Sequence, residues 1–183
     1  MITVKHIFKS FADVQILKDI SFVFETGKTN LIIGKSGSGK SVLTKCIVGL
    51  FEPDEGEIFY DDRKLSDLKP KARKEIRKEI GMLFQASALF DSLTVEENVA
   101  FPLNMFTKMT KEEISDRVNF CLNRVNIINK NQLFPSELSG GMQKRVAIAR
   151  AIAMQPKYLF CDEPNSGLDP VTAIVIDELI KEI

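Results

Sequence analysis

Short apolar runs with glycines at their ends dominate the first sixty residues, and this pattern predicts β-strands. Four runs are rich in β-branched and aromatic residues: ITVKHIFKSF, ILKDISFVFE, TNLIIG and GEIFYD. Gly27, Gly34 and Gly56 lie at the ends of these runs, as turn residues do. From Lys40, apolar residues recur at helical spacing until Gly49, so a helix is expected there.

The pattern becomes helical from about Thr94 to Met154, after a charged helix, KPKARKEIRKEI, and a short apolar strand, GMLF. Pro156 ends the helical spacing, and the apolar run KYLFCDE that follows predicts a strand buried on both faces. Asp169 and Pro170 form an N-cap and first-turn pair for a last helix, PVTAIVIDELIKEI. Because strand and helix alternate on both sides of a helical insertion, the pattern favours an α/β core with an inserted helical subdomain.

Composition and charge exclude several classes of protein. The 183 residues are 44% hydrophobic and 27% charged, which is typical of a globular domain. Twenty-five basic and twenty-five acidic side chains cancel, so no overall field attracts nucleic acid or a membrane. Three scattered cysteines and one histidine predict neither a disulfide framework nor a structural zinc site. Free cysteines of this kind favour a protein of the reducing cytosol. Neither a secretion signal nor a membrane-spanning run is visible, so work at a membrane would require docking to a spanning partner.

The stretch GKSGSGKS fits the phosphate-binding pattern G-x-x-x-x-G-K-[ST], between the apolar residues LII and a helix. Glycines let the backbone curl around an anion, and the helix start adds partial positive charge. Lys40 is expected to reach the β- and γ-phosphates, and Ser41 to ligate Mg²⁺. The nucleotide-binding residues predicted here are Gly34, Lys35, Ser36, Gly37, Ser38, Gly39, Lys40 and Ser41.

Two acidic residues follow the apolar run KYLFC and supply the other half of the expected site. Asp162 and Glu163 come at the carboxyl end of a strand, where ligands gather in open α/β sheets. Asp162 would hold the hydration shell of Mg²⁺. Glu163 would polarise the attacking water as a general base.

A second anion-binding helix start lies in LSGGMQ. Ser139 caps a helix whose first residues, Gly140 and Gly141, leave the backbone N–H groups accessible. One nucleotide needs only one phosphate-binding loop, and the stretch from Gly34 to Ser41 already supplies it. The sequence therefore predicts a dimer, in which this turn closes over the γ-phosphate held by the other copy.

These motifs together resemble the nucleotide-binding domain of ABC transporters. The match runs in order through Gly34–Ser41, Gln85, LSGGM, YLFCDEP and SGLD, over essentially the whole chain. The resemblance implies a P-loop NTPase fold, with a RecA-like α/β core, an antiparallel β subdomain and an inserted helical subdomain. Residues 1–86 would form the β subdomain and P-loop core, 87–155 the helical subdomain, and 156–183 the rest of the core.

The resemblance also assigns roles to further residues. Lys40, Gln85 and Glu163 would be catalytic, and Ser41, Gln85 and Asp162 would hold the metal, with ATP and Mg²⁺ as the cofactors. Asp169 would lie in the loop that crosses the dimer interface. Phe11 stands where the family places an aromatic residue on adenine, and Phe8 is the nearby alternative.

The segment that follows Gln85 points to a subfamily. FQASALFDSLTVEENVAFPL is similar to the ATPases of bacterial MCE-type (Mla-like) phospholipid transport systems, as are Met142 and Asn165. The partners implied are a second copy of the domain, a membrane permease and an MCE-domain lipid-binding protein, at the cytoplasmic face of the inner membrane. Leu89, Phe90 and Asp91 are expected to face the permease, while most apolar residues nearby form the subdomain's own core.

Three alternatives stay open. The first is an ATPase of an importer for amino acids or another small solute. The second is a nucleotide sensor that binds without turnover, against which Glu163 argues. The third is a repair or translation ATPase, but the segment between Gln85 and Ser139 is too short for a long coiled coil, and no nucleic-acid partner is expected.

The family carries a histidine one strand beyond its acidic pair, and no histidine follows Glu163 before Ile183. The chain is therefore expected to be truncated at its C-terminus and to bind and hydrolyse ATP poorly on its own. The apolar positions of the last helix are expected to be partly uncovered, namely Val171, Ile174, Val175, Leu179 and Ile183.

Overall fold

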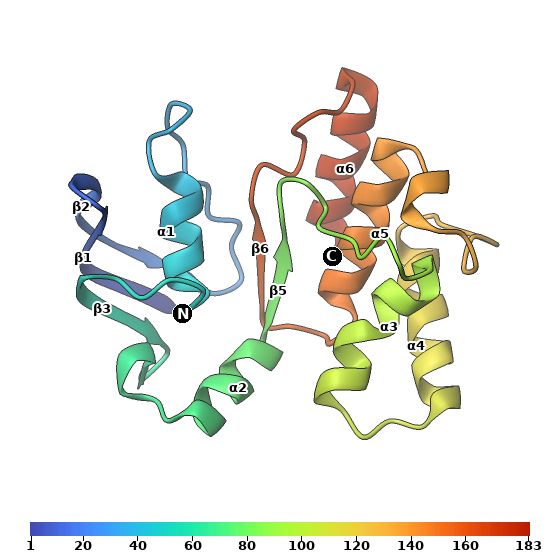
Figure 1. The fold of residues 1–183 in the computed structure, drawn as a ribbon, viewed down its shortest axis with the longest axis horizontal. Helices are drawn as coiled ribbons and strands as arrows, with labels where there is room; N and C mark the ends of the chain where they lie inside the picture. Colours follow the sequence, from blue (N-terminus) through green and yellow to red (C-terminus); the bar gives the residue numbers. More distant parts are fainter. The chain divides into compact units, whose positions relative to one another are not determined.

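The computed structural model describes all 183 residues, which form two compact units, Met1–Arg77 and Lys78–Ile183 (Figure 1). Both units mix helices and strands, in agreement with the expected fold class. No helix combines the length and the apolar character that crossing a membrane requires.

The first unit is an antiparallel sheet with one helix packed on it. Its strands lie in the order β2-β1-β3-β4. The elements are β1 (Ile2–Phe11), β2 (Val14–Phe24), α1 (Lys40–Ile47), β3 (Glu55–Tyr60), β4 (Arg63–Lys64), a 3₁₀ turn (Leu65–Asp67) and α2 (Pro70–Lys78). Three of the four predicted strands and both predicted helices are thereby confirmed.

Burial along β1 explains how the sheet holds α1. Ile2 and Val4 are buried with the alternation of a strand, and Ile7 is buried again after a shift in the pairing register between Val4 and Ile7. Leu43, Cys46 and Ile47 of α1 are buried as well, and they share one face of the helix. The buried Tyr60 hydroxyl donates to the Ile47 carbonyl at 2.9 Å, so the end of β3 also holds the end of the helix.

The predicted strand TNLIIG is wrong. Residues 29–35 form no strand, and Leu31 and Ile33 are 79% and 85% exposed. A short apolar run becomes a strand when neighbouring strands pair with its backbone and cover its side chains. The sheet of this unit pairs only β1 to β4, so the run remains an extended connection between β2 and α1.

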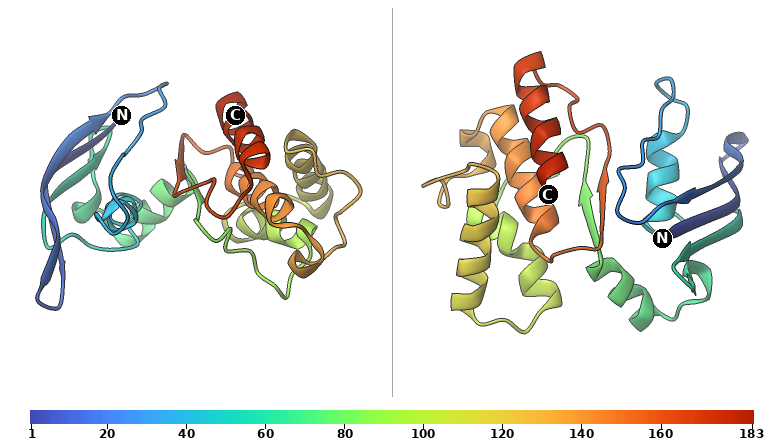
Figure 2. Two further views of the ribbon diagram at one scale, coloured as in Figure 1. Left: turned by 90° about the horizontal axis from the view of Figure 1, so that it is seen from above. Right: turned by 180° about the vertical axis from the view of Figure 1, so that it is seen from behind.

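The second unit is a helical bundle beside a two-stranded parallel sheet (Figure 2). The strands β5 and β6 pair from Ile80 opposite Tyr158 to Leu83 opposite Cys161. Its elements are β5 (Ile80–Leu83), α3 (Val95–Phe106), α4 (Lys111–Arg124), a 3₁₀ turn (Pro135–Glu137), α5 (Gly140–Ile152), β6 (Tyr158–Cys161) and α6 (Pro170–Glu182).

The helix α5 is the centre of this unit, because it packs against α3, α4, α6 and β5. Its Val146, Ala147 and Ala149 have no exposed surface. Small residues at these positions let the neighbouring helices approach closely, and one continuous apolar core results. Every predicted helix of this segment is confirmed.

Side chains cap the starts of three helices, and one of these caps was predicted. Thr94 and Thr110 form complete capping boxes with Glu97 and Glu113, at the starts of α3 and α4. Asp169 accepts the backbone N–H groups of Val171 and Thr172, both at 3.1 Å, and so caps α6 as predicted.

The expected burial of the strand KYLFCDE is wrong. All four residues of β6 are only half-buried, because the strand has a single partner, β5, and its other edge is unpaired. In the last helix, Val171, Ile174 and Ile183 are exposed as expected, whereas Leu179 is buried against α5. The division at residues 86 and 155 stays a prediction.

Candidate functional site

The glycine-rich loop lies in the first unit, where it leads directly into α1. Residues 34–38 are exposed, and α1 begins at Lys40 with Gly39 as its N-cap. No side chain caps this helix start. Its first N–H groups therefore depend on water or a ligand, and this makes the turn an anion site in the way the sequence predicted.

Gly39 is the position where the loop requires glycine. Its φ of 94° is in the left-handed region. A Cβ atom there would lie 3.0 Å from Ile16 Cγ2 and 3.1 Å from Leu17 Cδ2 of β2. The loop is thus pressed against β2, and the chain can turn into α1 at this point only without a side chain.

The Lys40 side chain folds back across the loop. Its Nζ donates to the carbonyls of Gly34 at 3.1 Å and Lys35 at 3.2 Å. The turn itself is closed by the Ser38 N–H, which donates to the Lys35 carbonyl at 3.1 Å. The ammonium therefore sits within the curl of the loop, next to the backbone groups that would face a phosphate.

Phe11 lies at the end of β1 and is 43% exposed. Its ring meets Phe51 edge-on, with centroids 5.4 Å apart, and Lys9 Nζ lies 5.5 Å from its centroid. Phe8 is only half-buried, so both candidates for the stacking ring stay open.

In the second unit, the structure brings Gln85 and Glu163 together. Gln85 Nε2 donates to Glu163 Oε2 at 2.7 Å and to Ser166 Oγ at 3.2 Å. Asp162 is buried just beyond β6, and its N–H donates to the Leu83 carbonyl at 2.9 Å, which extends the β5–β6 ladder. Glu163 leaves the strand with a φ of 46°. Strained backbone of this kind is typical of functional turns, and here it directs the carboxylate toward Gln85.

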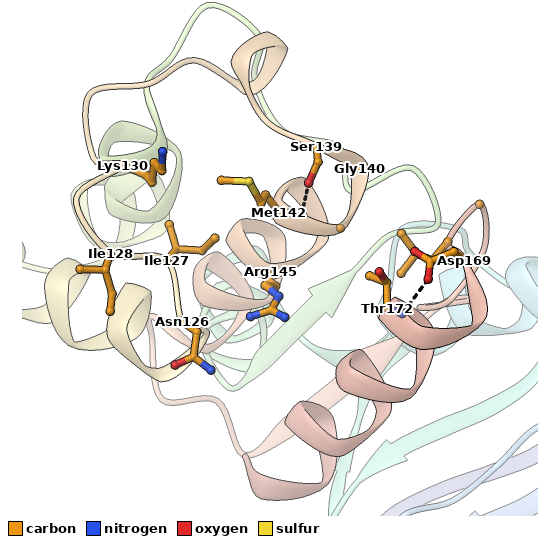
Figure 3. A pocket seen from close by; sticks show the side chains of 13 residues that line it. Asn126, Ile127, Ile128, Lys130, Ser139, Gly140, Met142, Arg145, Asp169 and Thr172 are labelled. Atoms are coloured by element: carbon orange, nitrogen blue, oxygen red, sulfur yellow. Dashed lines mark hydrogen bonds between the residues drawn. The ribbon is translucent and has the colours of Figure 1, made fainter.

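The serine-glycine turn lines a pocket of about 550 Å³ in the second unit (Figure 3). Ser139 accepts the Met142 N–H at 3.3 Å and caps α5, as predicted. Gly140 has open space where a side chain would point, whereas a Cβ atom on Gly141 would lie 2.8 Å from Thr172 of α6. The pocket also contains Lys130, Arg145 and Asp169, together with Asn126, Ile127, Ile128, Met142, Gly167, Leu168 and Thr172.

Charge in this pocket favours an anion. Lys130 and Arg145 line it, Lys130 from the loop after α4 and Arg145 from α5 (Figure 3). Asp169 is the one acidic residue of the lining. The hydrogen bond of the Thr172 side chain, followed by those of the backbone N–H groups at the start of α6, lowers the pKa of the Asp169 carboxyl.

The donor chemistry of the predicted metal site fits Mg²⁺. Ser41, Gln85 and Asp162 offer a hydroxyl, an amide and a carboxylate, and such oxygen donors suit a hard cation. No group of three or more histidine, cysteine or acidic side chains gathers in the structure. Few protein ligands are what Mg²⁺ takes when phosphate oxygens complete its coordination.

The loop predicted to face a permease is fixed by a residue that sequence reasoning missed. The fully buried Asn98 donates from Nδ2 to the carbonyls of Phe90, Leu93 and Thr94, and its Oδ1 accepts the Phe90 N–H at 2.8 Å. Phe90 is 42% exposed and Asp91 is exposed, while Leu89 packs against the core. An asparagine inside an apolar helical pattern is the only sequence signal for this arrangement.

Two cations of α5 were also missed. Lys144 is 3% exposed and donates from Nζ to the carbonyls of Phe84 and Gln85. Arg150 donates to the carbonyls of Ser87 and Ala88, both at 2.8 Å. Burial lowers the pKa of Lys144, and that of Arg150 as well. In the sequence both residues look like ordinary surface cations of an amphipathic helix.

Comparison with known proteins finds a matching family model and several curated relatives. Residues 17–166 match the family described as ABC transporter. The chain is 44% identical over 183 residues to the methionine import ATP-binding protein MetN of Clostridioides difficile, of which it covers 57%. It is 41% identical to the probable ribonucleotide transport ATP-binding protein mkl of Mycobacterium leprae, covering 52%, and 40% identical to the protein TRIGALACTOSYLDIACYLGLYCEROL 3, chloroplastic, of Arabidopsis thaliana, covering 55%. All of this chain is aligned in each case, so it spans a little over half the length of these curated relatives.

Solved structures of ATP-binding cassettes have the same fold as this chain. All of the chain superposes on 82% of MJ0796, described as a bacterial ABC transporter cassette in a dimeric structure, with a TM-score of 0.92 and 36% identity. A dimeric post-hydrolysis state of the same ATP-binding cassette, bound to ADP and Pi, gives a TM-score of 0.90 at 35% identity, again over 82% of that chain.

Proposed function

The chain belongs to the ABC transporter family, and we propose that it is the ATP-hydrolysing subunit of a bacterial transporter that moves phospholipid across or between membranes. The family and the fold agree with the sequence prediction, as do ATP and Mg²⁺ as the expected cofactors. The contact of Gln85 with Glu163 carries the proposed ATP hydrolysis, because it places a carboxylate and an amide next to each other at one turn.

Each unit contributes one part of the proposed reaction. Lys40 and the loop that begins at Gly34 bind the phosphates through the ammonium and backbone N–H groups. Glu163 accepts a proton from the attacking water, and Gln85 orients that water and the carboxylate. Ser41, Gln85 and Asp162 are the residues that would hold Mg²⁺, and the ion would offset the charge of the phosphate oxygens.

A second copy of the chain completes each site in this proposal. The pocket beside Ser139 combines the start of α5 with two cations, and both a helix start and positive side chains favour a phosphate. Gly140 leaves that pocket unobstructed, and Asp169 lies in it. The similar cassette MJ0796 is described as dimeric, which supports pairing with a second copy.

The proposed membrane partner is a permease that contacts Leu89, Phe90 and Asp91. Phe90 presents part of its ring to solvent while Asn98 fixes the loop beneath it. A preformed apolar contact of this kind suits a short helix from a spanning subunit. The chain would then act at the cytoplasmic face of the inner membrane, with an MCE-domain protein as a further partner.

Poor ATP turnover by this chain on its own stays a prediction. The exposed apolar side chains of Leu31 and Ile33 support it.

A small-solute importer is the second candidate, because two methionine import ATP-binding proteins are 44% and 43% identical to this chain. The lipid proposal rests on the segment from Phe84 to Leu103. It also rests on the similarity to the plant protein TRIGALACTOSYLDIACYLGLYCEROL 3, which is named after a galactolipid. The chemistry of the ATPase site is the same in both candidates.

One experiment separates the two candidates. The full-length protein is purified with its membrane partners, and bound lipid is identified by mass spectrometry. ATP turnover is then measured in vesicles with added phospholipid or with methionine and its receptor. Co-purified phospholipid, and turnover stimulated by phospholipid alone, would support the proposal. Stimulation by the amino acid alone would replace it with the importer.

A further inference from the structure

One helix holds most of the loop that contains Gln85. Lys144 donates to the carbonyls of Phe84 and Gln85, and Arg150, six residues further along α5, donates to those of Ser87 and Ala88. Both cations reach backbone carbonyls and not acidic side chains. Their contacts therefore fix the path of the chain directly, independent of any rotamer in the loop.

The loop needs such support, because its backbone is strained. Ser87 and Ala88 have φ values of 61° and 49°, so two successive residues with a Cβ atom occupy the left-handed region. The loop has two short hydrogen-bonded turns of its own, from Ser87 to Phe84 and from Ala88 to Ala86. Strained turns of this kind persist where the surroundings hold them, and here the surroundings are two side chains of α5.

Lys144 is not explained by packing alone. It is 3% exposed, and a buried ammonium costs desolvation free energy that an apolar side chain of equal length would avoid. The charge of Asp162 favours the ammonium, whereas burial raises the pKa of the Cys161 thiol to about 11 and keeps it neutral. The two loop carbonyls are the groups that hold the Lys144 ammonium directly.

The same helix begins at the serine-glycine turn. Ser139 is the N-cap of α5, and Lys144 lies less than two turns further on. A helix is rigid over that length. The serine-glycine turn and Lys144 therefore belong to one rigid segment, which reaches the carbonyl of Gln85.

We propose that Lys144 is a positioning residue: it fixes the backbone of Gln85 so that the side-chain amide meets Glu163, and it ties this contact to the start of α5. Arg150 fixes the far end of the same loop. This inference rests on the proposed function, in which Gln85 and Glu163 act on the attacking water.

The test uses the full-length protein with its membrane partners and compares Lys144→Met with Lys144→Gln. Methionine keeps the apolar stem and removes the donors, whereas glutamine keeps an N–H donor for the loop carbonyls. We expect kcat for ATP to fall about tenfold or more in Lys144→Met, with KM and the dissociation constant of a fluorescent ATP analogue changed less than about twofold. Lys144→Gln should recover most of kcat.

Arg117→Met is the matched control. Arg117 donates to the carbonyls of Ile152 and Ala153, both at 2.9 Å, so it also supports α5 through two backbone carbonyls, but at the end far from Gln85. It should lower the Tm as Lys144→Met does and leave kcat unchanged below the unfolding transition. Equal loss of kcat in both variants would overturn the proposal, since it would reduce Lys144 to a general stabiliser of the fold.

Hydrogen exchange gives a readout that does not depend on the activity of Lys144→Met. Exchange of the amides of residues 84–88, measured without nucleotide, should be fastest in Lys144→Met, closer to the parent in Lys144→Gln, and unchanged in Arg117→Met. If Lys144→Met fails to fold, Lys144→Leu, which also lacks the donors, takes its place, and unchanged exchange in it overturns the proposal.

A double-mutant cycle separates this inference from the proposed function. If Lys144 acts through Gln85, then Lys144→Met should cost little further activity in a Gln85→Ala background. Additive losses would overturn the positioning role and leave the proposed function intact. If Gln85→Ala itself leaves turnover unchanged, the proposed role of Gln85 fails, and with it the basis of this inference.

Discussion

The side-chain amide of Gln85 donates to the carboxylate of Glu163 at 2.7 Å, although 78 positions separate them in the sequence. The parallel pairing of β5 with β6 produces this contact, because both strands end at the same edge of the sheet. Glu163 then turns out of the ladder at a φ of 46°. The hydrogen bond from Gln85 therefore orients the carboxylate of Glu163 at the end of the ladder.

Replacing Glu163 by glutamine should abolish turnover and preserve nucleotide binding. The amide keeps the size of the side chain but cannot accept a proton from water, and general-base losses are about 100-fold to 10,000-fold. We expect ATP to hold the full-length protein as a dimer in size-exclusion chromatography. Glu178→Gln, an exposed change on α6, serves as the control and should have parental turnover. Substantial hydrolysis by the Glu163 variant would show that another group is the base.

Replacing Ser139 by alanine should affect function more than stability. The lost cap to the Met142 N–H costs about 1 kcal/mol of folding free energy. Thr94→Ala removes an equivalent cap from α3 and is the matched control. Chemical denaturation should show similar losses for the two variants, whereas only Ser139→Ala should weaken ATP-dependent dimerisation and turnover. Parallel behaviour of the two variants would remove Ser139 from the nucleotide site.

Local chemistry made most elements predictable. The strand β1 and the helix that starts at Lys40 were predicted to within a residue, because alternation and a Gly-Lys start are strong local signals. The caps at Ser139 and Asp169 were predictable for the same reason, since each satisfies N–H groups two or three residues away.

The features that the sequence did not predict depend on contacts between segments that are far apart in the chain. The run around Leu31 and Ile33 has the composition of a strand, but composition cannot say whether a partner strand is available, and no strand pairs with it. The half-burial of β6 has the same cause. Lys144 and Asn98 were missed because their roles depend on carbonyls of a loop that only the tertiary structure brings within reach.

The exposed ring of Phe90 should be required for coupling to the membrane partner. Phe90→Ala removes apolar surface that the structure leaves 42% exposed, while the loop stays fixed by the backbone bonds to Asn98. We expect less permease to co-purify with the variant and little change in its Tm. Phe120→Ala, another exposed phenylalanine, on α4, is the control and should co-purify normally. Retained permease in the Phe90 variant would place the contact elsewhere.

Asp54 should make the stability of the first unit dependent on acid. Its carboxylate accepts from Lys9 Nζ and from the Ser10 N–H, both at 2.6 Å, so it holds the end of β1 next to Phe11. The hydrogen bond from Lys9, followed by that from Ser10, lowers the pKa of Asp54 below its ordinary value of 3.8.

The direction of the effect follows from that pKa. Since the folded state favours the ionised carboxyl, the contribution of Asp54 to stability is complete above pH 3.8 and is lost as the pH falls through the lower, folded-state pKa. Asp54→Asn should therefore have a lower Tm than the parent at pH 7, and the difference should vanish only below pH 3.8. Asp62→Asn, in the exposed turn between β3 and β4, is the control and should follow the parent throughout. A Tm difference for Asp54→Asn that persists unchanged at the lowest pH would show that the asparagine disturbs packing and that the charge of Asp54 does not stabilise the end of β1.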